Sequence, residues 1–305
     1  MTTISTMNSG APSMTAGDRD GSAPAGNARP GEGYNGAGSR SRKPDNTVIR
    51  IRDTTIGGDA LSVIGGPSEY KSREQLEEVA RLLKASGAHI LRGEFVLGVE
   101  EGMDIEGLQT LRDVAHRHGL LAMTPVPSSQ HVQVCAEYAD ILAVGVRNMQ
   151  NRDLLHHLGK TDKAVLLRRG LSATYRDLLR CADFILERGN PNVILLERGI
   201  RTFETYTSNT LDIAAIPALQ TLSHLPVFAD PTHAPGRREM VGPLSKAVVA
   251  AGASGIFIEL DLDDDNQDGE RDIALSAREW SRLAFDLESL APIVGKTYGP
   301  VQPLA

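Results

Sequence analysis

Strand and helix signals alternate eight times between residues 61 and 290 of this chain. Amphipathic helical patterns cover residues 73–86, 105–118, 176–188, 242–251 and 277–290. Eight such units over about 240 residues predict a single (β/α)8 TIM barrel. A doubly wound open sheet is the alternative, but no glycine-rich nucleotide loop follows the first strand. Apolar runs suited to buried strands cover residues 61–65, 89–95, 121–126, 141–146, 164–168, 192–197, 226–229 and 255–260.

The first 45 residues differ in composition from the rest of the chain. They are rich in Gly, Ser, Ala, Pro, Asn and Arg and nearly lack large apolar side chains. Such a segment buries too little surface to offset the entropy of ordering, so we expect a disordered tail over residues 1–45. Alternation over residues 48–56, followed by Gly57 and Gly58, predicts a β-hairpin at residues 46–58. The barrel domain, with this hairpin at its start, is then expected to occupy residues 46–305.

Charge and hydropathy exclude several classes of partner. The net charge of -7 over 305 residues argues against nucleic acid or an anionic membrane surface. No apolar run approaches the length of a spanning helix, and no signal-peptide pattern is evident at the start. Cys135 and Cys181 are expected to be reduced buried thiols. These features predict a cytoplasmic protein with a small-molecule ligand.

Arginines lie at or near the carboxyl ends of four of the predicted strands. Since the carboxyl ends of the strands meet at one face of a barrel, these side chains should converge there. A cluster of guanidinium groups in an acidic protein needs a counter-anion, and the planar fork of arginine suits phosphate and carboxylate. We therefore expect an anionic ligand; pairing with Glu94, Glu197 and neighbouring acids is the alternative. The four residues are Arg92, Arg147, Arg168 and Arg198.

Possible metal ligands follow two other neighbouring strands. His233 lies just after the strand at 226–229, and Glu259 lies near the end of the strand at 255–260. An imidazole with carboxylates suits Mn, Fe(II), Co or Zn. The acidic run at residues 261–265 is interpreted as a solvated loop rather than as a set of ligands.

A series of motifs at the strand ends resembles one known family. The motifs are Gly66-Pro67, Leu-Arg-Gly at 91–93, Gly-Val-Arg-Asn-Met-Gln-Asn at 145–151, and the stretches 166–174 and 190–211, followed by Asp-Pro-Thr-His at 230–233 and Gly-Arg-Arg at 236–238. Their order and spacing are similar to those of the type I 3-deoxy-D-arabino-heptulosonate 7-phosphate (DAHP) synthases. The resemblance covers about residues 47–290. It implies a (β/α)8 barrel, a homo-oligomer, and metal-dependent condensation of phosphoenolpyruvate (PEP) with erythrose 4-phosphate.

The resemblance also implies roles for the arginines. Arg147 and Arg198 stand where the family holds the phosphate of PEP, and Arg92 stands where it holds the carboxylate. Arg168 occupies the place of a family lysine; it keeps the charge but does not release a proton near neutral pH. The catalytic group implied in this way comprises Arg92, Arg168 and His233.

A weakened metal site is implied as well. His233 and Glu259 match two family ligands, and Asp268 matches a third. The family's cysteine ligand is replaced here by Ser68, whose neutral hydroxyl is a poorer ligand than a thiolate. Any Mn, Co, Fe or Zn ion should therefore bind weakly, or the site should favour a harder ion.

The largest departure from the family follows Arg92. The family has a Lys-Pro-Arg-Thr loop that contacts PEP and the aldehyde phosphate, whereas residues 93–104 contain no lysine or arginine and begin with Gly93-Glu94. An acidic loop repels a sugar phosphate. We therefore expect a condensing enzyme with a different co-substrate, contacted by Glu94 and used in specialised metabolism. A degenerate paralogue with a binding or regulatory role is one alternative. An ordinary DAHP synthase whose aldehyde phosphate is held by Arg237 or Arg238 is the other.

Overall fold

Eight parallel strands close into a barrel in the computed structural model, which describes residues 33–70, 72–93, 104–262 and 273–301. Each strand pairs with the next along the chain, and the last pairs with the first. The closed (β/α)8 barrel predicted from the alternating pattern is thereby confirmed. The strands are β3 (Ser62–Gly66), β4 (Ile90–Arg92), β5 (Leu121–Pro125), β6 (Ile141–Val144), β7 (Ala164–Arg168), β8 (Val193–Glu197), β9 (Val227–Ala229) and β10 (Gly255–Glu259).

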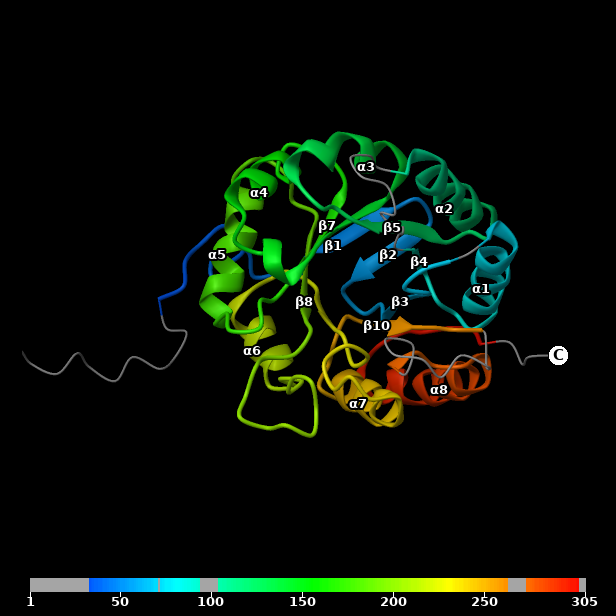
Figure 1. Ribbon diagram of the computed structural model, residues 1–305. Coiled ribbons are helices and arrows are strands. Elements are labelled where there is room, and N and C mark those ends of the chain that lie inside the picture. Colours follow the sequence, from blue (N-terminus) through cyan, green and yellow to red (C-terminus); the bar gives the residue numbers. More distant parts are fainter. Residues whose placement is uncertain (1–32, 71, 94–103, 263–272, 302–305) are drawn as a thin grey trace, which may run out of the picture. The chain divides into compact units, whose positions relative to one another are not determined.

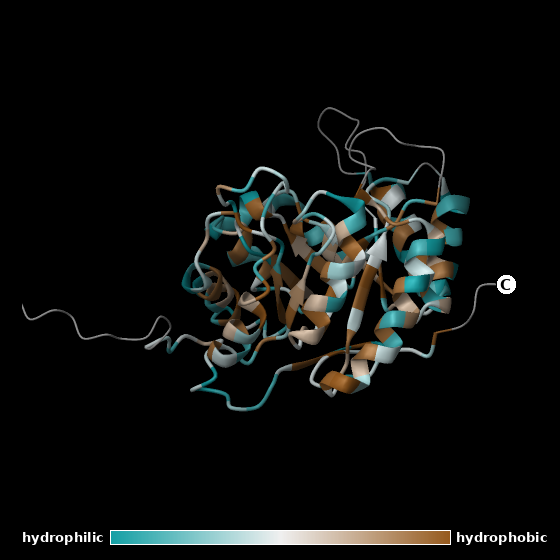
Figure 2. Ribbon diagram, turned by 90° about the horizontal axis from the view of Figure 1, so that it is seen from below, coloured by the Kyte–Doolittle hydropathy of each residue, from teal (hydrophilic) through white to brown (hydrophobic). Residues whose placement is uncertain are grey.

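Helices surround the barrel as an outer ring (Figure 1). Three of them, α3, α4 and α6, span only seven or eight residues, and such short helices show too few turns for their periodicity to be recognised in the sequence. Hydrophilic residues gather on the outer sides of the helices, while the strands are mostly hydrophobic (Figure 2). The helices are α1 (Arg73–Ala85), α2 (Ile105–Arg117), α3 (Val132–Tyr138), α4 (Arg152–Leu158), α5 (Tyr175–Leu186), α6 (Ala215–Leu222), α7 (Arg238–Ala250) and α8 (Ala277–Leu290).

Alternate residues of each barrel strand face two different hydrophobic cores. One face packs under the helices, and the other fills the barrel interior. Leu166 of β7, Leu196 of β8 and Phe257 of β10 belong to the interior cluster. Continuing the same parity by two residues directs Arg168, Arg198 and Glu259 toward the interior at the carboxyl end of the strands. This end of the barrel is called the mouth below.

A β-hairpin closes the opposite end of the barrel. Its strands are β1 (Val48–Ile51) and β2 (Thr54–Gly57), as the alternating pattern predicted. Ile49 and Ile56 are fully buried and belong to the same interior cluster as the inward residues of the barrel strands. Burial of these two side chains explains the alternation, because only one face of the hairpin meets the barrel.

Residues 33–47, here called the strap, pack against α5 and the turn between α6 and β9. Asp183 of α5 accepts hydrogen bonds from the Tyr34 hydroxyl (2.7 Å) and the Gly38 amide (2.8 Å). Ser39 forms a β-bridge with Ser223. Composition alone placed this segment in the expected disordered tail, but residues 33–45 belong to the packed structure because specific hydrogen bonds replace apolar burial. Residues 1–32 lie outside the described residues.

No helix in the described ranges is long and apolar enough to cross a membrane.

Candidate active site

Three of the predicted arginines lie on consecutive strand ends. Arg147 lies in the 3-10 turn Val146–Asn148 directly after β6, Arg168 is the last residue of β7, and Arg198 follows β8. Strands β6, β7 and β8 are neighbours in the barrel, and neighbouring strands lie about 4.8 Å apart. The fourth, Arg92, ends β4. The topology therefore brings all four predicted cations to the mouth.

Arg92 and Arg168 share one aromatic ring. Their guanidinium carbons lie 4.8 Å and 5.0 Å from the centre of the Phe257 ring. Arg92 is almost fully buried, and its Nη1 atom is 3.6 Å from Oε2 of Glu259. Contact with the ring stabilises both cations at a desolvated position. The sequence analysis missed Phe257, although its position two residues before Glu259 places both on the same strand face.

Arg198 is placed differently. Its Nε atom is buried and has no hydrogen-bond partner among the described residues. The preceding residue, Glu197, is fixed because its Oε1 atom accepts a hydrogen bond from the amide of Gly199 (2.6 Å). The backbone on both sides of Arg198 is therefore held while its guanidinium keeps donors for a ligand.

Arg169 follows Arg168 in sequence but faces away from the mouth. Its Nη1 atom lies 2.7 Å from Glu197 and 2.9 Å from Asp212, and its Nε atom donates to the carbonyl of Ala173 (2.9 Å). Burial raises the pKa of Glu197, and the charge of Arg169 opposes that rise. Internal pairing, the alternative to an anionic ligand, therefore applies to Arg169 with Glu197 and, at the mouth, to Arg92 with Glu259.

His233 lies between two buried carboxylates. Its Nδ1 atom is 2.9 Å from Asp230 Oδ2, and its Nε2 atom is 3.1 Å from Glu259 Oε2. The Ser68 hydroxyl donates to the other oxygen of Glu259. Asp230 was noted from the sequence only as a strand-end residue, and its function here is to orient the imidazole ring.

The charges of this cluster determine its protonation. Burial would lower the pKa of His233, but Asp230 and Glu259 overcome it and raise the pKa to about 9. Burial would likewise raise the pKa of Asp230, but the His233 cation lowers it to about 2, with a smaller effect of Arg168. The pKa of Glu259 is lowered against its burial by His233 and Arg92. An imidazolium thus links two carboxylates.

These side chains fit part of a divalent-metal site. With Nδ1 held by Asp230, the Nε2 atom of His233 is directed at Glu259, so one cation can contact both residues. Across the described part of the chain, no group of three His, Cys, Asp or Glu side chains is placed to hold a metal. The third predicted ligand, Asp268, and the predicted co-substrate residue Glu94 both lie outside the described residues.

A (β/α)8 barrel with arginines and a histidine–carboxylate cluster at its mouth defines a class of barrel enzymes whose site lies at the carboxyl ends of the strands. The family model described as "DAHP synthetase I family" matches residues 44–294, and the chain belongs to this family. It is therefore a DAHP-synthase-like biosynthetic transferase, as the motif resemblance predicted.

Curated and solved relatives agree with this assignment. The phospho-2-dehydro-3-deoxyheptonate aldolase of Thermotoga maritima is 38% identical over 262 residues, which cover 84% of this chain and 78% of that protein. A solved truncated form of the Thermotoga maritima DAHP synthase superposes with a TM-score of 0.80 and covers 85% of this chain and 97% of that one. The 2-dehydro-3-deoxyphosphooctonate aldolase of Caulobacter vibrioides (strain NA1000 / CB15N) is 28% identical over 281 residues, 79% of this chain and 93% of that protein.

Proposed function

We propose that this enzyme condenses PEP, or a similar small molecule with a phosphate and a carboxylate, with an acceptor other than erythrose 4-phosphate. The observation that carries the proposal is the convergence of four arginines at the mouth of an acidic protein, two of them against Phe257. Like charges gathered at a partly desolvated position favour an anionic ligand, and arginine pairs with phosphate and carboxylate through parallel hydrogen bonds.

The proposed roles follow from position. Arg147 and Arg198, on the strand ends that flank β7, hold the phosphate, while Arg92 and Arg168 hold the carboxylate beside Phe257. Fixing both ends of the substrate presents its enol carbon in one orientation, which lowers the entropic part of the barrier. Because Arg168 does not deprotonate, a proton needed at this point has to come from another group or from water.

His233 and Glu259 would hold a divalent metal, with Ser68 beside them and Asp268 as the ligand implied by the family resemblance. When bound, such an ion polarises the carbonyl of the acceptor. The Ser68 hydroxyl in place of a thiolate favours weaker binding or a harder ion. Asp230 keeps the Nε2 atom of His233 directed toward Glu259, so it acts through His233.

The choice of acceptor rests on charge. Residues 94–104 contain Glu94, Glu100, Glu101 and Asp104 and no lysine or arginine. An acceptor that is uncharged, or that carries an amine, suits such a segment better than a sugar phosphate does. A pathway of specialised metabolism would account for this change of acceptor.

The opposing candidate, an ordinary DAHP synthase, is favoured by the 38% identity to the Thermotoga maritima enzyme. It would need other cations for the aldehyde phosphate. Arg238 is paired with Glu279 (2.7 Å from Nε), and Arg237 donates to the carbonyl of Tyr206 (2.7 Å). To hold a phosphate, Arg238 would have to leave its ion pair with Glu279 and Arg237 its ion pair with Glu239, which supports the first candidate.

The test measures phosphate release from PEP with saturating Mn²⁺, in the presence of erythrose 4-phosphate or of non-phosphorylated and amine-bearing aldehydes. We expect calorimetry to show PEP binding. We expect phosphate release only with one of the non-phosphorylated or amine-bearing aldehydes. Turnover with erythrose 4-phosphate on the order of 1 per second would establish an ordinary DAHP synthase instead. Absence of both PEP binding and metal uptake would support the alternative of a degenerate binding or regulatory subunit.

A further inference from the structure

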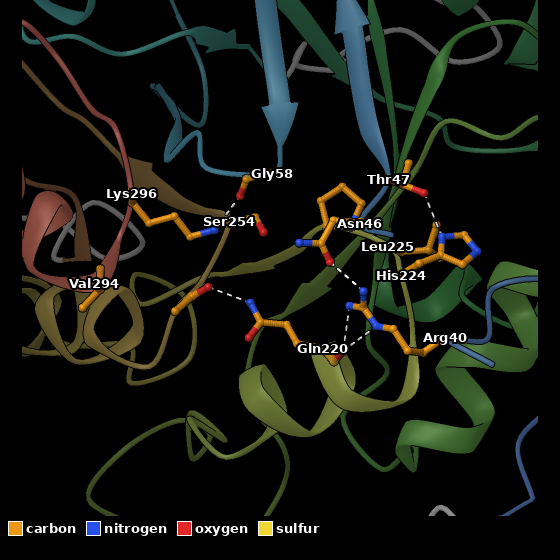
Figure 3. Close-up of a pocket in the computed structure, with 12 residues that line it drawn as sticks. Arg40, Asn46, Thr47, Gly58, Gln220, His224, Leu225, Ser254, Val294 and Lys296 are labelled. Atoms are coloured by element: carbon orange, nitrogen blue, oxygen red, sulfur yellow. Dashed lines mark hydrogen bonds between the residues drawn. The ribbon is translucent and has the colours of Figure 1, made fainter. Parts of the chain in front are cut away.

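A cavity of about 360 Å³ lies at the hairpin end of the barrel, opposite the mouth (Figure 3). Here it is called the basal cavity. Segments far apart in sequence meet around it: the strap, the turn after β2, the end of α6 with the turn before β9, the residues just before β10, and the segment after α8. Its volume is within the range of small-molecule sites. It shares no lining residue with the cluster at the mouth, so it is independent of the proposed reaction.

Two cationic side chains line the basal cavity, Arg40 and Lys296, and Lys296 is the one that keeps unused donors. Its Nζ atom donates one hydrogen bond, to the carbonyl of Gly58 (2.7 Å), and an ammonium group has three donors. Among the described residues, no carboxylate lies within ion-pair distance of this ammonium group. Lys296 is half-buried, and this burial lowers its pKa, while Asp59 opposes the shift. A partly desolvated ammonium group with donors to spare favours an anion.

Asn46 directs a second donor into the same space. Arg40 donates from Nη1 to the Asn46 Oδ1 atom (2.8 Å), and because arginine only donates, the amide oxygen must face it. The NH₂ group of Asn46 therefore points the other way, toward the cavity and Lys296 (Figure 3). Arg40 also donates to the carbonyls of Pro44, Gln220 and Ser223, and these hydrogen bonds fix the position of its guanidinium. The fixed guanidinium in turn orients the side-chain amide of Asn46.

Ser254 completes the set of donors. Only 6% of its surface is exposed, and its hydroxyl makes no hydrogen bond to another described residue. His224, by contrast, is fully engaged, with Nδ1 at Thr47 (2.7 Å) and Nε2 at the carbonyl of Ala37 (3.1 Å). A nearly buried hydroxyl that lines a cavity without a partner is normally satisfied by water or by a ligand.

The rest of the lining is mixed: polar side chains such as Gln220 and Thr47 lie beside a smaller apolar part, and no acidic side chain is among the lining residues. A site with an ammonium group, an amide NH₂ and a hydroxyl next to apolar groups matches a ligand that has an anionic acceptor at one end and a short apolar body at the other. The apolar contacts would come from Leu225, Pro226 and Val294.

We propose that the basal cavity binds a small carboxylate, with its oxygens on Lys296, Asn46 and Ser254 and its body against the apolar wall. Such a ligand joins the strap, the turn after β2 and the segment after α8, which are separate parts of the chain. Binding to the folded state alone raises the thermal midpoint. The ligand would therefore stabilise the closure of this end of the barrel.

The test uses calorimetry on the full chain with benzoate as probe, in the presence of saturating PEP so that the mouth is occupied. Benzamide is the uncharged control, and inorganic phosphate tests whether an anion alone suffices. We expect benzoate to bind and to raise the thermal midpoint, and benzamide to do neither. Absence of benzoate binding up to about 10 mM, or binding of phosphate in its place, would overturn the proposal.

Two variants locate the binding. Asn46→Asp keeps the acceptor for Arg40 and replaces the donor with a negative charge, so benzoate affinity should fall at least about tenfold. Ser254→Ala removes a hydroxyl without a partner among the described residues, so the fold should be kept while affinity falls severalfold. Wild-type affinity in both variants, with unchanged folding by circular dichroism, would mean that benzoate binds elsewhere and that the proposal is wrong.

Discussion

Replacing Arg198 with methionine tests the anion site at the mouth. The side chain of methionine is similar in length but uncharged, so the change removes the guanidinium and keeps much of the packing. The Nε atom of Arg198 is buried and has no hydrogen-bond partner among the described residues, and none of the carboxylates described there forms an ion pair with its guanidinium. Removing it should therefore leave the fold intact and affect mainly the ligand.

The expected loss follows from one charge-assisted contact. Such a hydrogen bond is worth about 1.5–3 kcal/mol. At room temperature this corresponds to a dissociation constant for PEP about 10- to 150-fold higher. Isothermal calorimetry at constant ionic strength measures the change directly, and the thermal midpoint verifies folding.

Two matched variants make the result specific. Arg201→Met removes an exposed arginine three residues further along the same loop and should change PEP affinity less than about twofold. Arg169→Met breaks the buried pair with Glu197 and should lower the free energy of unfolding by about 3–5 kcal/mol. Equal PEP affinity in wild type, Arg198→Met and Arg201→Met would refute the assignment of Arg198 to the anion site.

Three further predictions concern the metal, the strap and pH. Ser68→Cys should tighten metal binding or shift the preference of the site toward Zn²⁺ over Mn²⁺. Elemental analysis of wild type and variant after dialysis measures the bound metal. Equal metal contents in the two proteins would argue against a role for residue 68. In urea titrations, Asp183→Ala should lower the free energy of unfolding by about 2–4 kcal/mol and Tyr34→Phe by about 1 kcal/mol, because the first removes the oxygen that accepts both hydrogen bonds from the strap and the second removes only one donor. Burial lowers the pKa of His89 from 6.5 to about 4. Between these two pH values the unfolded chain therefore binds more protons than the folded protein does. The free energy of unfolding should fall by up to about 3 kcal/mol as the pH drops through this window. His89→Gln should flatten this dependence, and an unchanged pH profile would contradict the buried neutral imidazole.

The barrel was predictable from the sequence because its signals are local. Apolar runs, helical periodicity and the alternation at residues 48–56 each lie within a few residues of the chain, and the structure matches them in β3 to β10 and in the hairpin. The position of the arginines at strand ends is equally local. Closure of the sheet then brings Arg147, Arg168 and Arg198 to one face by topology alone.

The strap and the basal cavity could not be predicted in the same way. Asp183 is separated from Tyr34 by 149 positions, and Lys296 from Gly58 by 238. Nothing near Tyr34 in the sequence shows that a carboxylate will meet it. Composition therefore suggested disorder for a segment that long-range hydrogen bonds hold in place.

The adjacent residues Arg168 and Arg169 show what the sequence determined and what the tertiary structure determined. The sequence by itself determined the fold class, the end of β7 and the presence of two cations there, because strand length and residue type are encoded locally. Only the tertiary structure decided that Arg168 lies against Phe257 while Arg169 pairs with Glu197 and Asp212. The physical reason is that successive strand residues face opposite sides of a sheet, and the partners on each side come from distant strands and loops.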